Sequence, residues 1–174
     1  AVVYQRRAFS WREIAHPFVQ RLVSSTEGVT VFRSPVGGAL HSLVGNHVVQ
    51  GLVIFPGAGY LELARGAAVA LERAGGLESV FFLQPLEIEA PGLQIECTVA
   101  DGRFEVRSDG ETVHCSGGFA SASWMRVDQA LVRGAQCVVP ADVSILYAGF
   151  DIAGLQYGPG YRTLACAWDS GHST

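Results

Sequence analysis

One histidine, His47, stands where its chemistry can be interpreted from the sequence of this 174-residue chain. It opens the apolar run 48–55, which ends at Pro56 and Gly57. An imidazole in such surroundings is partly removed from water, and a neutral imidazole can accept a proton. Free backbone N–H groups at a helix start beyond Pro56 would polarise a carbonyl oxygen. The pattern predicts proton abstraction next to a carbonyl, and the alternative is that His47 is an ordinary core histidine.

The cysteines do not form a recognisable ligand set. Cys97, Cys115, Cys137 and Cys166 are far apart in the sequence and include no C-x-x-C pair. This spacing argues against a zinc site and predicts reduced core residues of a cytoplasmic protein. The chain also lacks a glycine-rich nucleotide motif. We therefore expect no metal site and no cofactor bound by this chain.

The composition favours one folded domain. Hydrophobic residues make up 49% of the chain and charged residues only 16%, so most of it can support a buried core. The net charge is −4 and there is no basic stripe, which argues against a nucleic-acid partner. The longest apolar stretch, 52–61, is interrupted at Pro56 and is shorter than the roughly 20 residues of a membrane helix. We expect no membrane span.

A long helix and a set of antiparallel strands must position His47. A helix is predicted over residues 58–74, where small and apolar side chains recur every three or four positions between flanking glycines. Strand patterns begin at Val29, and alternating residues predict strands over the ranges 93–100, 103–107 and 112–120, joined by Asp-Gly turns. A shorter helix is expected over 141–150. Together these elements predict an α+β fold, a curved antiparallel sheet around one Ala-rich helix.

Four segments together resemble the dehydratase domains of type I polyketide synthases. The pattern H-x-x-x-G-x-x-x-x-P is realised by His47, Gly51 and Pro56 and continues as PGAGYLELA. Tyr157-Gly158-Pro159 is similar to the family's tyrosine motif, with Gln156 where the common form differs. YQRRAFSW with the following His-Pro resembles the end of the linker that leads from an acyltransferase, and FLQPLEI (82–88) resembles the strand after the family's helix.

The resemblance implies a double hot-dog fold, of which this chain holds the first half. Residues 1–12 would be the linker from a preceding acyltransferase-type domain. Residues 13–150 would form the N-terminal hot-dog lobe. Residues 151–174 would begin the connection to a second lobe, which is absent from the chain.

The resemblance also implies an enzyme, a hydro-lyase that removes water from a 3-hydroxyacyl thioester held by acyl carrier protein. His47 would be the catalytic base. The substrate-binding residues would be Gly51, Pro56, Gly57, Tyr157, Gly158 and Pro159. The acid would be an aspartate of the missing lobe, because no aspartate of this chain stands in the matching motif. Expected partners are the carrier protein, other domains of the same synthase and a second copy in a homodimer, and the phosphopantetheine arm belongs to the substrate.

Other functions remain open at this point. The chain could be a non-catalytic dehydratase-like lobe that binds acyl chains or organises packing. A product-template cyclase or a double-bond isomerase would keep the same histidine and differ in the second lobe. A free-standing single hot-dog thioesterase is disfavoured by the connector and by the tyrosine motif.

Overall fold

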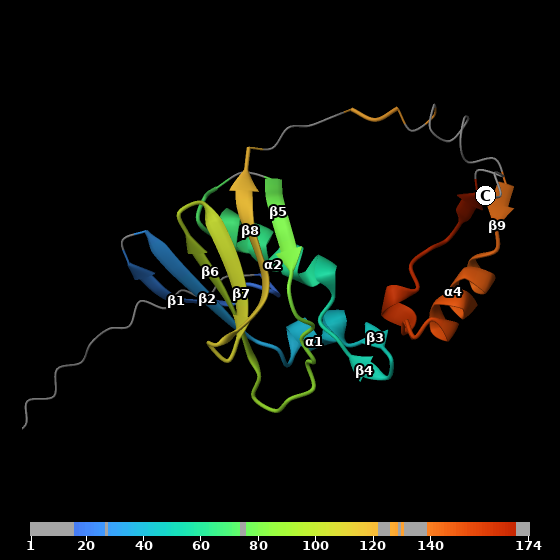
Figure 1. Cartoon of the computed structure of the whole chain (residues 1–174), viewed down its shortest axis with the longest axis horizontal. Helices are drawn as coiled ribbons and strands as arrows, with labels where there is room; N and C mark the ends of the chain where they lie inside the picture. Colours follow the sequence, from blue (N-terminus) through green and yellow to red (C-terminus); the bar gives the residue numbers. More distant parts are fainter. Residues whose placement is uncertain are drawn as a thin grey trace, which may run out of the picture.

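The computed structural model describes residues 16–26, 28–73, 76–121, 126–128, 130 and 139–169 (Figure 1). The predicted linker, 1–12, and Cys137 lie outside these residues. The segment 16–121 contains the large sheet and the long helix. The segment 139–169 lies beside one end of this body, next to the short strands β3 and β4 (Figure 1).

One antiparallel sheet of six strands forms the body, in the order β1-β2-β6-β7-β8-β5. The strands are β1 (Arg21–Thr26), β2 (Val29–Pro35), β5 (Gly76–Phe82), β6 (Gln94–Ala100), β7 (Arg103–Ser108) and β8 (Thr112–Ala120). The three strands predicted from alternation are confirmed to within one residue. The edge strands β1 and β5 carry no such alternation. The strand expected within 82–88 lies earlier, as β5, and the segment after it contributes only a bridge from Glu87 to Ile54.

The Asp-Gly pairs form the tight turns that the sequence predicts. Asp101 and Gly102 have φ values of 47° and 73°, and Asp109 and Gly110 have φ values of 49° and 77°. Two consecutive left-handed residues are typical of the type I′ turn, whose twist matches that of the flanking strands. These turns fix the β6-β7-β8 meander.

The helix α2 (Gly57–Ala70) packs against one face of the sheet and contacts β5, β6 and β7 (Figure 1). Its buried side chains include Leu63, Ala64 and Ala67. Gly66 allows a close approach, because a Cβ there would lie 2.9 Å from the side chain of Val19. Such small residues let neighbouring segments, including the one that contains Val19, pack closely on the helix.

The helix ends four residues before the predicted end at residue 74. Arg73 N–H donates to Ala68 O at 2.9 Å, and Glu72 N–H donates to Val69 O at 2.9 Å. Glu72 has a φ of 55° and occupies the left-handed position that glycine usually takes in this Schellman C-cap. The capping bonds therefore form upstream of the glycines, and Gly76 instead begins β5.

The core lies between α2 and the inner face of the sheet. Among its fully buried side chains are Phe32, Leu63, Ile95, Phe104 and Val106. Burial of each such side chain contributes about 1.5–3 kcal/mol. Cys97 and Cys115 are buried as predicted, whereas Cys166 is exposed. The core prediction is wrong for Cys166 because its segment lies outside the sheet and helix.

The apolar run 48–55 is not one strand. It forms β3 (Val48–Val49) and β4 (Leu52–Val53), which pair as a hairpin. Gln50 and Gly51 have φ values of 51° and 81°, so the chain reverses direction in the middle of the run. The short helix α1 (Ala39–Val44) precedes this hairpin.

The C-terminal part contains α4 (Val143–Ile152), the 3-10 turn η1 (Pro159–Tyr161) and the paired strands β9 (Val139–Ala141) and β10 (Ala167–Asp169). The helix α4 begins at Asp142, whose carboxylate accepts from Ser144 N–H at 2.8 Å. It continues across the boundary predicted at residue 150. No helix within the described ranges is long and apolar enough to cross a membrane.

Candidate active site

His47 lies at the base of the β3-β4 hairpin, where Ile54 binds both its backbone and its side chain. Ile54 N–H donates to His47 O at 3.1 Å, and His47 Nδ1 lies 2.7 Å from Ile54 O. A carbonyl oxygen can only accept, so Nδ1 carries the hydrogen and Nε2 keeps its lone pair. Within the described residues, Nε2 has no hydrogen-bond partner. The half-buried imidazole is thus set to accept a proton at Nε2.

The hairpin is anchored to the body of the fold through residues 53–55. Phe55 N–H donates to Leu86 O at 2.8 Å, and Ile88 N–H donates to Val53 O at 3.0 Å. These bonds continue the bridge between Ile54 and the segment 86–88. The backbone that orients His47 is therefore tied to the buried Phe55 and not to a free loop.

The helix α2 begins two residues after Phe55 and presents unpaired amides. Pro56 is the N-cap, and Gly59 N–H donates back to Pro56 O at 2.8 Å. In the part of the chain that the structure describes, the N–H groups of Gly57 and Ala58 have no acceptor, and both residues are exposed. The first amides of a helix carry partial positive charge and attract a developing oxyanion.

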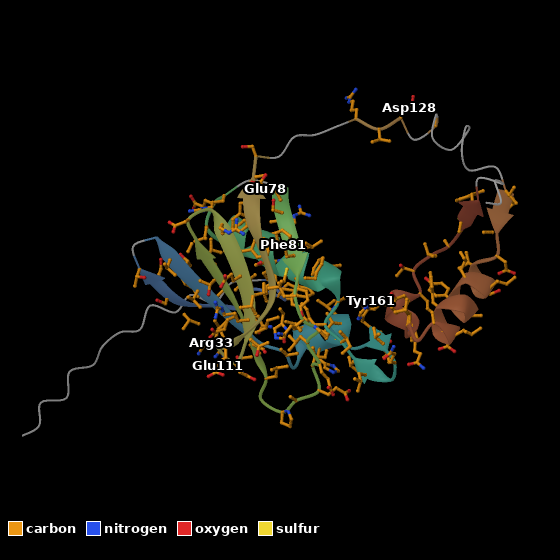
Figure 2. The ribbon with its side chains drawn as sticks, in the orientation of Figure 1. Arg33, Glu78, Phe81, Glu111, Asp128 and Tyr161 are labelled. Atoms are coloured by element: carbon orange, nitrogen blue, oxygen red, sulfur yellow. The ribbon has the colours of Figure 1, made fainter. Side chains whose placement is uncertain are left out.

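The tyrosine motif lies against the histidine hairpin although it is more than a hundred residues away in the sequence. The ring of Tyr157 stacks on that of His47 with centroids 5.5 Å apart and an interplanar angle of 29°. The ring of Tyr161 lies 5.3 Å from the same imidazole, where the C-terminal part meets the hairpin (Figure 2). Burial, together with the adjacent Tyr157, raises the pKa of the Tyr161 hydroxyl. Two aromatic rings therefore flank the imidazole.

The backbone of this segment pairs with the hairpin. Gln156 N–H donates to Val48 O at 2.9 Å, and Gly158 N–H donates to Asn46 O at 2.9 Å. The side chain of Asn46 also lies directly against Gly158. Pro159 begins η1 and is exposed. Tyr157 and Gly158 are thus placed at the histidine, whereas Pro159 turns the chain at the surface.

The helix α4 supports the tyrosine motif from behind. Tyr147 accepts a hydrogen bond from Leu164 N–H at 3.1 Å, and the guanidinium of Arg162 lies 5.7 Å from the centre of the Tyr147 ring. Phe150 contacts both Tyr147 and Tyr157 edge to face, at 5.8 and 6.0 Å. This aromatic chain links the helix to the ring that stacks on the imidazole.

Several of these partners are not identifiable from sequence reasoning. Tyr161 is a second aromatic residue, four positions after Tyr157. This spacing is the sequence signal that indicates a second aromatic wall of the site. Asn46 directly precedes His47, but nothing in its type predicts a contact with the motif. Ile54 acts through its main chain, so its residue type carries no signal at all.

His114 provides a contrast with His47. It is buried, its Nδ1 donates to Gln84 O at 3.1 Å, and its Nε2 lies 2.8 Å from the hydroxyl of Ser108. Both ring nitrogens are satisfied, as expected of a core histidine. The neighbouring Tyr60 has a buried hydroxyl without a partner among the described residues. Burial, and to a smaller extent Cys115, raises the pKa of that hydroxyl.

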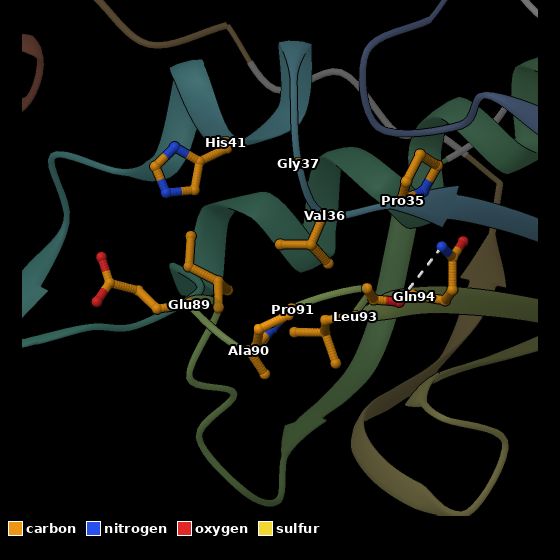
Figure 3. A pocket seen from close by; sticks show the side chains of 11 residues that line it. Pro35, Val36, Gly37, His41, Glu89, Ala90, Pro91, Leu93 and Gln94 are labelled. Atoms are coloured by element: carbon orange, nitrogen blue, oxygen red, sulfur yellow. Dashed lines mark hydrogen bonds between the residues drawn. The ribbon is translucent and has the colours of Figure 1, made fainter.

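Among the residues that the structure describes, no acidic side chain is bonded to His47. Within the same ranges, no group of three or more side chains could hold a metal ion. A groove of about 510 Å³ lies elsewhere, lined by residues 35–37, His41 and 88–94 (Figure 3). His41 and Glu89 lie at one end of it, and neither His47 nor the tyrosines line it.

Comparison with known proteins identifies relatives of this chain. The model of the polyketide synthase dehydratase domain matches residues 16–109. The chain is 30% identical over 176 residues to polyketide synthase PksM of Bacillus subtilis, and the match covers 87% of the chain. It is 28% identical over 172 residues to polyketide synthase GfsB of Streptomyces halstedii, which covers 89% of the chain. The chain spans only about 4% and 3% of these two relatives.

Solved structures share the fold. The dehydratase domain from the CurF module of curacin polyketide synthase matches with a TM-score of 0.78 and 23% identity, over 88% of this chain and 62% of that one. The erythromycin dehydratase matches with a TM-score of 0.75 and 22% identity, over 91% of this chain and 64% of that one. The predicted hot-dog fold, an antiparallel sheet around a central helix, is thereby confirmed.

Proposed function

The chain belongs to the polyketide synthase dehydratase domain family, and on that premise we propose that it supplies the basic half of a dehydratase active site. The reaction is the elimination of water from a 3-hydroxyacyl thioester carried by acyl carrier protein, which gives a 2-enoyl thioester. The observation that carries the proposal is the state of His47: its Nδ1–H is bonded to Ile54 O, and its Nε2 is left as the acceptor.

His47 acts as the base in this proposal. Its Nε2 takes the proton from C2 of the acyl chain, and the electron pair of the broken C–H bond is delocalised onto the thioester oxygen. As the C3–O bond breaks, this pair forms the C2–C3 double bond, and the leaving hydroxyl takes a proton from an acid and departs as water. A positioned base contributes typically about 10²–10⁴-fold to such a step.

The thioester carbonyl is placed at the start of α2. Negative charge develops on its oxygen as the C2 proton leaves, and the free amides of Gly57 and Ala58 are the donors that the proposal assigns to it. Loss of one such donor typically costs about 10²–10³-fold in rate. Gly51 and Pro56 shape the turns on either side of this position.

The acyl chain runs past the tyrosine motif in the same proposal. Tyr157 and Gly158 lie at the imidazole, and the exposed Pro159 follows them, so a chain bound at His47 would pass along this segment. The ring stacked on the base offers an apolar wall and limits access of water to Nε2.

The acid is expected from a second hot-dog lobe of the parent polypeptide. The solved CurF domain is longer than this chain, which covers 62% of it. An aspartate on that lobe would protonate the leaving hydroxyl. The other expected partners are the acyl carrier protein, further domains of the synthase and a second copy in a homodimer, with no cofactor bound by this chain.

Dehydration by the longer polypeptide that carries both lobes tests the proposal. A 3-hydroxyacyl carrier-protein thioester is supplied, and the loss of one water is followed by mass. We expect His47→Ala to lower the rate by about 10²–10⁴-fold. His41→Ala is the matched control, because His41 is exposed on α1 and has no contact with the site.

Each outcome separates the candidate functions. Equal rates for the two variants would refute His47 as the base. No turnover by the unaltered polypeptide would favour a non-catalytic lobe. Turnover by the 174-residue chain alone that is lost in His47→Ala would mean that an acid lies within this chain or across a dimer.

A further inference from the structure

One side chain joins the two motifs that make up the candidate site. Gln156 Oε1 accepts from Gly51 N–H at 2.7 Å. Gly51 is the central glycine of the histidine motif, and Gln156 directly precedes Tyr157 of the tyrosine motif. This side-chain hydrogen bond connects two motifs that are 105 positions apart in the sequence.

The tip of the β3-β4 hairpin needs outside partners for its amides. Each strand has only two residues, and an isolated hairpin of this size is not stable in water. The C-terminal segment accepts both tip donors: Gln50 N–H donates to Gly154 O at 2.7 Å, and Gly51 N–H donates to the Gln156 side chain. The segment therefore supports the tip of the hairpin whose base carries His47.

The remaining contacts pair the backbone of this segment with the hairpin. It runs antiparallel to residues 46–50, with a bridge from Val49 to Leu155 and bonds at every second residue. Backbone pairing of this kind has a period of two and is not specific for one register. A slip by one residue would turn Tyr157 to the opposite face, and a slip by two would carry it past His47.

The side chain of Gln156 distinguishes these registers. Its acceptor reaches the amide of Gly51 in the register in which Gln156 N–H is paired with Val48 O. In that register the next residue, Tyr157, stacks on the imidazole. A residue without an acceptor at position 156 would leave the backbone ladder as the main register determinant.

We infer that Gln156 is a positioning residue for the base: its bond to Gly51 N–H sets the register that holds Tyr157 and Tyr161 against His47. The inference deepens the proposed function and rests on it for the catalytic meaning of His47. The geometry itself can be tested without substrate, so the two can fail separately.

The experiment follows the folded 174-residue chain by NMR. Gln156→Leu and Gln156→Ala remove the acceptor, and Gln156→Glu keeps one. Gln94→Leu is the control, on a half-buried glutamine of β6 whose side chain bonds Gly92 O. Hydrogen exchange of the Gly51 amide reports the bond. The ring-proton shifts of His47 report the two tyrosine rings, because aromatic ring currents move them.

We expect the Leu and Ala variants to speed exchange at Gly51 by about 2- to 10-fold, as for loss of one exposed hydrogen bond. The His47 ring protons should move toward the values of an unstacked imidazole in the same two variants. Gln156→Glu and Gln94→Leu should leave both readouts unchanged. In the two-lobe polypeptide, Gln156→Leu should lower kcat with little change in KM, and Gln156→Glu should restore kcat.

An unchanged His47 shift in both the Leu and Ala variants would overturn the inference, whether or not exchange at Gly51 accelerates. A Glu variant that behaves like the Leu variant would also overturn it. Dehydration that survives His47→Ala would refute the proposed function, while the NMR result would still stand. Since the Gln156 side chain is exposed, its truncation removes no core packing.

Discussion

A single methyl group at Gly158 should separate the tyrosine motif from the base. Gly158 has φ −72° and ψ 176°, a conformation open to any residue, so Gly158→Ala introduces no backbone strain. The new Cβ would lie 2.8 Å from Asn46 Cγ and 3.0 Å from Asn46 Cβ, and closer still to Oδ1. Carbon atoms in contact normally lie about 3.5–4.0 Å apart, so the two segments must move apart by about 0.5–1 Å.

The free-energy cost of this clash can be compared with the contribution of the hydrogen bond that holds the segment. Overpacking of a tight contact costs typically about 1–3 kcal/mol. The backbone bond at this point, Gly158 N–H to Asn46 O, contributes about 0.5–1.5 kcal/mol. The clash therefore outweighs the local bond, and the ratio of docked to undocked segment should fall by about 5- to 150-fold. The sheet and α2 do not take part, so global stability should change little.

The assay combines the His47 ring-proton shifts, thermal unfolding of the chain and dehydration by the two-lobe polypeptide. Gly160→Ala is the matched control, since its Cβ would lie an ordinary 3.4 Å from Asn46 Nδ2. Gly158→Ala should shift the His47 signals and lower the rate, and Asn46→Gly in the same chain should relieve both effects. Equal behaviour of the two alanine variants, or no relief by Asn46→Gly, would refute the steric argument.

Four further experiments test the core and its thiols. Gly59→Ala places a Cβ within 2.9 Å of a buried phenyl ring, and we expect urea denaturation to show a loss of about 1–3 kcal/mol. Tyr60→Phe removes a buried hydroxyl that has no partner among the described residues, so the urea midpoint should rise. A fall in the midpoint would show that the hydroxyl is satisfied. Burial raises the pKa of Cys97 to about 12 and that of Cys115 to about 11, from the ordinary thiol value of 9.0. Thiols in the unfolded chain therefore ionise at a lower pH than the buried thiols of the folded chain. The free energy of unfolding should fall as the pH rises from 9 to 12, and it should fall less in Cys97→Ala. At pH 8 a thiol reagent should label the exposed Cys166 in the folded chain and the two buried cysteines only in urea, as peptide mass mapping would show.

Local patterns predicted the parts of the fold that local chemistry controls. Strand alternation and the Asp-Gly pairs specify β6, β7 and β8, because the side-chain period and the left-handed turn are properties of neighbouring residues. The Ala-rich stretch specifies α2 for the same reason. The end of α2 was less predictable: either a glycine or another residue in the left-handed conformation can close a Schellman cap, and Glu72 does so here.

The apolar run 48–55 shows the limit of pattern reasoning. A continuous apolar stretch is equally compatible with one strand and with two short strands. The reversal at Gln50 and Gly51 is stabilised by acceptors on the C-terminal segment, which no local window contains. The two-strand hairpin is therefore a tertiary outcome.

The sequence by itself determined which residue types are present at the proposed site: a histidine before an apolar run, a proline-glycine helix start and a pair of tyrosines. Only the tertiary structure decided how they work together. The carbonyl of Ile54 selects the proton-accepting nitrogen of His47, and Gln156 and Asn46 hold the tyrosines against it. These contacts join main-chain atoms and residues distant in the sequence. Their geometry depends on how the packed elements meet, which residue types alone do not encode.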